Sequence, residues 1–198
     1  MTEDLSPKAQ EIAGRARALL TAGGYHSFSY ADLAAQVGIT KASIHHHFPS
    51  KAQLVRTVVI QHREQMMEGL ALLESKVDGL GGPLAALNGY AEYWAKCIRT
   101  GAPSFCINAM LATELPTIPE EVAAEVRAHF EGLCHWLEAV LKNGARLGQL
   151  HLDDTAAAAA RSLMATVHGA MLVARALDDP KAFHAIVQPA IRRLGTAP

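Results

Sequence analysis

Three cysteines and ten histidines are the residues of this chain best suited to nucleophilic, redox or metal chemistry. Cys97, Cys106 and Cys134 are odd in number and have no paired spacing, so a disulfide framework is not expected. Cys106 follows Pro103 at the start of a predicted short helix, where backbone N–H groups and the helix dipole lower the pKa of a thiol. Cys106 is therefore a candidate reactive sensing residue, with a small buried apolar side chain as the alternative.

The run His45-His46-His47 suggests metal binding, but its geometry opposes it. Consecutive residues of a helix point about 100° apart and cannot converge on one ion. No two histidines of the chain are four residues apart either. We predict no metal site and no cofactor. A metal- or redox-sensing regulator that uses the three cysteines and nearby histidines stays open as an alternative.

A cysteine-dependent hydrolase is a more remote alternative. It would require His129, His135 or His168 to approach Cys106 in space. The chain has no G-x-S-x-G elbow, no Gly-rich phosphate loop and no H-E-x-x-H motif. We therefore predict that the protein is not an enzyme.

The elements that position these residues are predicted to be helices throughout. Half of the chain is hydrophobic, mostly through alanine and leucine, which have high helix propensity. Proline, glycine and capping residues divide the chain into nine predicted helices with no convincing strand, so the expected fold is all-α. The longest apolar stretch, residues 155–177, contains Arg161, His168 and Arg175, which favours a buried helix over a membrane span. A cytoplasmic protein without a membrane partner is expected.

Charge is divided unevenly along the chain. Residues 1–63 carry seven basic and four acidic side chains, whereas residues 64–198 carry eleven basic and fifteen acidic ones. A mildly basic first part and an acidic second part suggest two tasks. We expect a DNA-binding domain over residues 1–50 and a helical ligand-binding and dimerisation domain over residues 51–198.

Residues Ser29 to Phe48 form the most specific pattern. Two short predicted helices are joined by Gly38-Ile39-Thr40, an arrangement in which the second helix can enter a major groove of DNA. Ser29 at a helix N-terminus suits either capping or a phosphate contact. The other candidate phosphate contacts, at helix starts, are Thr40, Lys41 and Lys51. Ala42 and Ser43 lie on the exposed turn, where small side chains allow close approach to bases.

The residues from Gly24 to Lys51 resemble the TetR family of bacterial transcriptional regulators. The matching segments are Gly24-Tyr25, Phe28 to Ala34 and Val37 to Lys51, within a gapless resemblance over about Ile12 to Leu54. The resemblance implies a three-helix helix-turn-helix domain, double-stranded operator DNA as partner, and contacts of His45 and His46 with the DNA backbone. Such imidazole contacts would strengthen as the pH falls. Ala42, Ser43 and His45 depart from the family's usual residues.

The second part of the chain contains candidate sensing residues. Aromatic and methionine side chains suit an apolar ligand cavity, although at helical spacing they also suit a plain core. The segment from Phe105 to Leu115 resembles the matching helix of family members that sense electrophiles. The candidate ligand-binding or sensing residues are Cys106, Trp94, Phe105, Met110, Trp136 and His168.

The last two predicted helices combine small and large apolar residues. In the resembling family such helices form a four-helix bundle between two subunits, which implies a homodimer that binds a pseudo-palindromic operator. The sequence therefore predicts a repressor that a small apolar or electrophilic inducer releases from DNA.

Overall fold

The computed structural model describes residues 5–80, 82–101 and 105–195. Within these residues the fold is all-α, as predicted, with nine α-helices, a short 3₁₀ helix at Tyr25–Ser27 and no strand beyond an isolated bridge. The α-helices are α1 (Pro7–Gly23), α2 (Tyr30–Val37), α3 (Lys41–His47), α4 (Lys51–Leu80), α5 (Gly82–Thr100), α6 (Ile107–Ala112), α7 (Glu120–Arg146), α8 (Ala156–Ala176) and α9 (Pro180–Leu194). Pro103, expected to open α6, lies outside the described residues.

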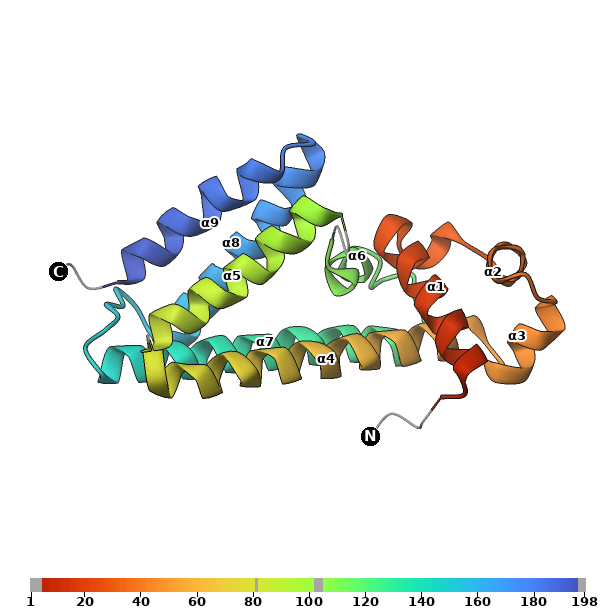
Figure 1. The fold of residues 1–198 in the computed structure, drawn as a ribbon, viewed down its shortest axis with the longest axis horizontal. Helices are drawn as coiled ribbons and strands as arrows, with labels where there is room; N and C mark the ends of the chain where they lie inside the picture. The colour runs from red at the N-terminus through yellow and green to blue at the C-terminus, as the bar shows by residue number, and fades with distance from the viewer. Residues whose placement is uncertain (1–4, 81, 102–104, 196–198) are drawn as a thin grey trace. The chain divides into compact units, whose positions relative to one another are not determined.

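Local sequence signals account for the turn between α2 and α3. Gly38 ends α2 in the left-handed conformation with φ of 71°, and its N–H donates to the carbonyl of Ala34. A residue with a Cβ would cost about 1–2 kcal/mol in this conformation. Thr40 then caps α3, because its side chain accepts a hydrogen bond from the backbone N–H of Ser43. The expected helix-turn-helix is therefore present (Figure 1).

The chain divides into two compact units. The first unit comprises the chain up to Gln65 together with Phe105–His129, and the second comprises Met66–Ser104 with Phe130–Pro198. This division differs from the boundary expected at residue 50, because α4 and α7 are each divided between the two units. The assignment of DNA binding and ligand binding to separate domains stays a prediction.

The first unit has an apolar core shared by α1, α2, α3 and the beginning of α4. Ile12, Leu33, Ile44 and Leu54 are all fully buried in it. The segment after α6 belongs to the same unit through Glu114, whose carboxylate accepts a hydrogen bond of 2.6 Å from the backbone N–H of Tyr25.

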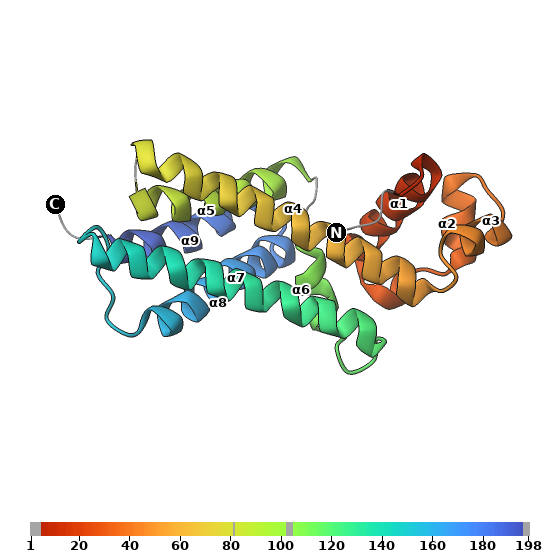
Figure 2. The same ribbon diagram turned by 90° about the horizontal axis from the view of Figure 1, so that it is seen from below.

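The second unit is built on the packing of α5, α8 and α9. Figure 1 shows these three helices side by side, and Figure 2 shows α5 next to α9 from a second direction. Tyr90, Trp94 and Phe183 are the largest fully buried side chains of this unit. An amide pair, Gln188 to Asn88 at 3.3 Å, also links α9 to α5.

One helix among the described residues, α8, is long and apolar enough to cross a membrane by length and composition alone. This is weak evidence, because the core helix of a globular protein passes the same test. Arg161 and Arg175 are exposed on α8, and only a third of its most apolar window is buried. A large apolar surface of α8 is thus left uncovered by this single chain.

Candidate functional site

The helix α3 presents one face to the core and the other to solvent. Ile44 is fully buried, and Phe48 at the end of the helix is nearly so. Lys41, Ala42, His45 and His46 are exposed, and Ser43 is half-buried. The residues predicted to face DNA on this helix therefore share one accessible surface, and the buried residues fix the helix beneath them.

The N-terminus of α2 is closed by a reciprocal capping box. The Ser29 hydroxyl accepts from the backbone N–H groups of Ala31 and Asp32, and it donates to the Asp32 carboxylate at 2.7 Å. The same carboxylate accepts from the backbone N–H of Ser29, and these hydrogen bonds lower the pKa of Asp32. Ser29 thus has a capping role, and its predicted phosphate contact would have to form beside a carboxylate.

Lys51 is turned toward the interior of the first unit. Its ammonium donates to the carbonyl of Phe28 and lies 4.2 Å from the ring centre of Phe28 and 4.6 Å from that of Tyr25. Desolvation lowers the pKa of Lys51, against the opposing charges of Glu114 and Asp32. Lys51 therefore has a role in the fold, and its predicted phosphate contact would require the ammonium to leave these partners.

The three consecutive histidines are held differently. Nδ1 of His45 lies 3.2 Å from the carbonyl oxygen of Pro49, and its ring packs edge-on against Tyr30 at 4.8 Å. A nitrogen paired with a carbonyl must donate, so Nε2 of His45 donates to a phosphate only when the ring is protonated. The rings of His46 and His47 pack edge to face, 5.3 Å apart. Direct DNA contact by His45 and His46 stays a prediction.

Cys106 does not have the activated thiol that its helix position suggested. It is the residue before α6 and is fully buried. Burial raises the pKa of the thiol to about 11, although the backbone N–H groups of Ala109 and Asn108 and the charge of Arg17 lower it. The expectation of a lowered pKa is wrong, because desolvation outweighs the hydrogen bonds and charge at the start of α6. The thiol is therefore protonated near neutral pH.

The other candidate sensing residues are divided between the units. Phe105 and Met110 belong to the first unit with Cys106, whereas Trp94, Trp136 and His168 belong to the second. Trp136 packs against Tyr90 with ring centres 5.7 Å apart. His168 lies 5.2 Å from Phe130, its Nδ1 is 2.9 Å from the carbonyl of Met164, and desolvation lowers its pKa.

Three of these residues share an unusual property. The indole nitrogens of Trp94 and Trp136 and Nε2 of His168 are buried without a hydrogen-bond partner in the described part of the chain. Buried polar atoms in native proteins are nearly always paired, with protein, water or ligand. The interior of the second unit thus offers two unused donors and one further imidazole nitrogen, on α5, α7 and α8.

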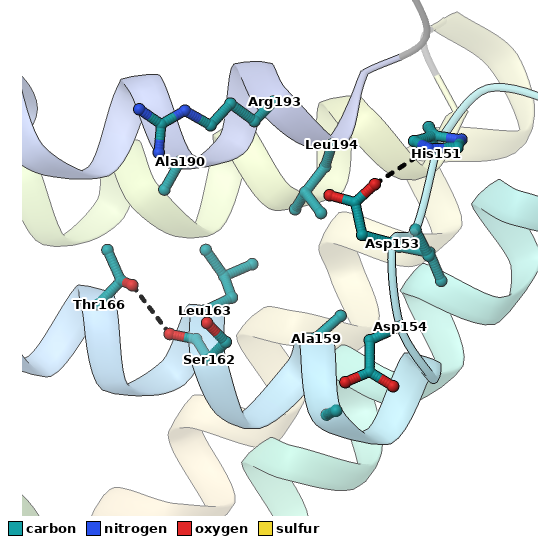
Figure 3. Close-up of a pocket in the computed structure, with 12 residues that line it drawn as sticks. His151, Asp153, Asp154, Ala159, Ser162, Leu163, Thr166, Ala190, Arg193 and Leu194 are labelled. Carbon is teal, nitrogen blue, oxygen red and sulfur yellow. Dashed lines mark hydrogen bonds and ion pairs between the residues drawn. The ribbon is translucent and has the colours of Figure 1, made fainter.

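Two open cavities lie on the second unit, away from the predicted sensing residues. One, of about 260 Å³, lies between α8 and α9 beside the loop that precedes α8 (Figure 3). The lining includes the ion-paired His151 and Asp153 together with Arg193. The other, of about 500 Å³, lies between α5 and the beginning of α9. Neither cavity is lined by any of the candidate sensing residues.

A group of residues that the sequence did not predict lies in the first unit. His62, Cys106 and His129 are all buried, and one potential ligand atom from each lies within 4.8 Å of the others. The two imidazole rings stack 5.6 Å apart. Burial, followed by the charge of Arg17, lowers the pKa of His62 to about 4. No spacing signal could have found this group, because its members are 44 and 23 residues apart in the sequence.

Two sequence models of protein families match the chain. A model of bacterial regulatory proteins of the tetR family matches residues 12–58. A model of the tetracyclin repressor-like C-terminal domain matches residues 83–189, which is more than half of the chain. Together they cover the helix-turn-helix and most of the helices from α5 to α9.

Known proteins resemble the chain over most of its length. The HTH-type transcriptional regulator UidR of Escherichia coli (strain K12) is 24% identical over 134 residues, 64% of this chain and 68% of that protein. A transcriptional regulator of the TetR family from Agrobacterium tumefaciens is 49% identical, with a TM-score of 0.92 over 96% of this chain and 98% of that one. The reduced form of NemR from E. coli has a TM-score of 0.82 at 17% identity, over 96% of this chain and 98% of that one, which is a likeness of fold alone.

Proposed function

Because the chain belongs to the TetR family of bacterial regulatory proteins, we propose that it is a ligand-responsive repressor, released from a pseudo-palindromic operator by a small inducer. The relatives UidR and the Agrobacterium protein are transcriptional regulators, and the helix-turn-helix places this chain in the same functional class. A cytoplasmic, non-enzymatic role follows from that class.

The DNA-binding proposal rests on the two faces of α3, of which one is buried in the core and the other is accessible to solvent. Ile44 anchors the helix in the core, while Lys41, Ala42 and His46 lie on its accessible side. Lys41 would contact a phosphate and so contribute affinity without reading sequence. Ala42 and Ser43 would lie against base edges, where a methyl group contacts thymine and a hydroxyl contacts either partner.

The second unit would supply the dimer interface through α8 and α9. Leu172 and Leu177 are 59% and 66% exposed, and Ile186 of α9 is 37% exposed. A Cβ added at Gly169 on α8 would meet nothing within 4 Å in the single chain. A second copy packed on this face would cover these residues and present two α3 helices to successive major grooves.

The inducer would occupy the interior of the second unit. The apolar surroundings of Trp94 and Trp136 favour a largely apolar molecule, and their unused N–H groups favour one with hydrogen-bond acceptors. The inducer would bind better to the form of the dimer in which the α3 helices are out of register with the DNA. Operator DNA would then weaken inducer binding by the same factor.

An electrophilic inducer that reacts with Cys106 is the alternative form of this proposal. Such a reaction requires the core of the first unit to open, because Cys106 is fully buried and its thiol is protonated near neutral pH. A Cys106→Ser variant that still released DNA on treatment with the electrophile would exclude it.

The experiment that tests DNA binding uses the segment upstream of the protein's own coding region and measures fluorescence anisotropy as a function of salt. Lys41→Ala should weaken binding and reduce the slope of log K against log salt by about 1 per subunit. Lys142→Ala removes an exposed lysine of α7 in the second unit and serves as the matched control. Equal salt slopes for the two variants would contradict the role of Lys41.

A further inference from the structure

His62, Cys106 and His129 form an unusual cluster of side chains outside the proposed DNA-binding surface. It combines side chains from α4, the residue before α6, and α7, all within the first unit. The exposed fractions of the three residues are 2%, 0% and 1%. Two imidazoles and a thiol thus meet in the buried interior of the first unit.

We propose that His62, Cys106 and His129 form a binding site for a thiophilic transition-metal cation. Two imidazole nitrogens and one thiolate would hold the ion, and the thiol proton of Cys106 would pass to solvent when it binds. Nε2 of His62 is buried without a hydrogen-bond partner among the described residues, so an ion that replaces its proton would displace no protein group from it.

The spacing of the ligand atoms is compatible with such a site after a small closure. Metal–nitrogen bonds of about 2.0 Å and metal–sulfur bonds of about 2.3 Å place ligand atoms about 3.3 to 3.7 Å apart. The observed separations are within 4.8 Å, so the ligand atoms need to approach one another by at most about 1.5 Å.

Charge and ligand number indicate which ions suit the site. Imidazole and thiolate ligands favour Zn²⁺ and Cu⁺ over Mg²⁺ or Ca²⁺, which take oxygen ligands. With two neutral imidazoles and one thiolate as ligands, the Cu⁺ complex would have no net charge. The Zn²⁺ complex would keep one positive charge and an open fourth coordination position. We therefore expect tighter binding of Cu⁺, with Zn²⁺ as the second ion that this chemistry accepts.

Arg17 of α1 would compete with the metal ion for the imidazole of His62. Its Nη2 lies 2.8 Å from Nδ1 of His62. A guanidinium only donates hydrogen bonds, so Nδ1 accepts and the ring proton of neutral His62 is on Nε2. A metal ion on Nε2 requires that proton to move to Nδ1 or to leave. If the proton moves to Nδ1, the Nδ1–H would face the N–H donors of Arg17. If the proton leaves, the metal ion and the Arg17 guanidinium would contact the two nitrogens of one deprotonated imidazole ring.

Occupation of the site would therefore displace Arg17 from His62. Because Arg17 belongs to α1, which packs against α2 in the DNA-binding unit, the ion would alter a contact inside that unit. This consequence rests on the proposed function, whereas binding of the ion does not. Metal binding is accordingly measured in the absence of DNA.

The test is a titration of the full-length chain with Cu⁺. The protein is prepared without metal in a non-thiol reductant, and its affinity for Cu⁺ is measured by competition with a chromophoric chelator. Co²⁺ serves as a spectroscopic probe of the Zn²⁺ arm. We expect one ion per chain and a thiolate-to-Co²⁺ charge-transfer band. Cys106→Ser should remove the band and weaken binding by about 100-fold or more. Cys134→Ser, which changes a half-exposed cysteine of the second unit, should bind as the wild type does.

A second variant keeps the proposal testable if Cys106→Ser does not fold. Arg17→Met should strengthen binding by about tenfold, because it frees Nδ1 of His62, whereas Arg15→Met on the same helix should leave it unchanged. Binding of neither ion at one equivalent would overturn the proposal. Binding that is equally tight in Cys106→Ser and in the wild type would overturn it as well.

Discussion

Arg17 of α1 and His62 of α4 are joined by a hydrogen bond of 2.8 Å, although the two residues are 45 positions apart in the sequence. The same guanidinium donates to Gln65 one turn later on α4, also at 2.8 Å. One side chain thus fastens the first helix of the DNA-binding unit to the helix that leads out of it.

Loss of this link should destabilise the protein. Arg17→Met removes both hydrogen bonds but keeps an apolar stem, so we expect the free energy of unfolding to fall by about 1–2 kcal/mol. Gln65→Ala keeps the bond to His62 and should have a smaller effect. Urea unfolding in the presence of a metal chelator measures both changes. Equal stability of Arg17→Met and the wild type would mean that the link contributes nothing.

Lys51 should act on stability rather than on phosphate binding. Lys51→Met leaves the carbonyl of Phe28 without its ammonium donor, so we expect a loss of about 1–2 kcal/mol in the free energy of unfolding. The salt dependence of DNA binding should stay as in the wild type, in contrast to Lys41→Met. A reduced slope of log K against log salt for Lys51→Met would show that Lys51 contacts a phosphate.

The sequence predicted the helix-turn-helix well because its signals are local. Ser29 with Asp32, Gly38 and Thr40 each satisfy backbone groups within four residues, and each caps a helix end in the structure. The burial of Ile44 likewise follows from its position on a short amphipathic helix. Signals of this kind need no knowledge of the tertiary structure.

The site residues were less predictable because burial is a property of the whole fold. The position of Cys106 before α6 suggested a lowered pKa, but desolvation by residues distant in the sequence raises it. The approach of His62 and His129 to Cys106 depends on how α4 and α7 meet in the first unit. The role of Lys51 depends in the same way on the rings of Tyr25 and Phe28.

His168 should make stability depend on pH. Burial lowers its pKa in the folded state, so below about pH 6.5 the unfolded chain takes up a proton that the folded chain does not. The free energy of unfolding should therefore fall as the pH decreases, by at most about 1.4 kcal/mol per pH unit for this group. His168→Gln should show a smaller loss between pH 7 and pH 5 than the wild type. His184→Gln, at an exposed position of α9, is the control, and identical pH profiles for all three proteins would contradict the prediction.

Intrinsic fluorescence should report directly on the proposed inducer site. Trp94 and Trp136 are the two tryptophans of the chain, and both are buried in the second unit. A largely apolar ligand with hydrogen-bond acceptors should shift or quench their emission and raise the melting temperature. Trp136→Phe keeps the ring packing but removes one N–H donor, so it should weaken such a ligand by about five- to tenfold. An inducer that releases DNA without any change in either emission would bind elsewhere.

The exposed apolar side of α8 should be required for dimerisation. Leu172→Glu places a charge at a position that is 59% exposed in the single chain, so the fold of one subunit should tolerate it. If a second copy covers α8, the buried charge should convert the dimer to a monomer in sedimentation experiments. DNA affinity should fall with it, because the dimer no longer offers two α3 helices to one operator. Leu72→Glu on α4 is a matched control, since Leu72 is 60% exposed, and it should remain a dimer. A dimeric Leu172→Glu protein would show that the two subunits meet through another surface.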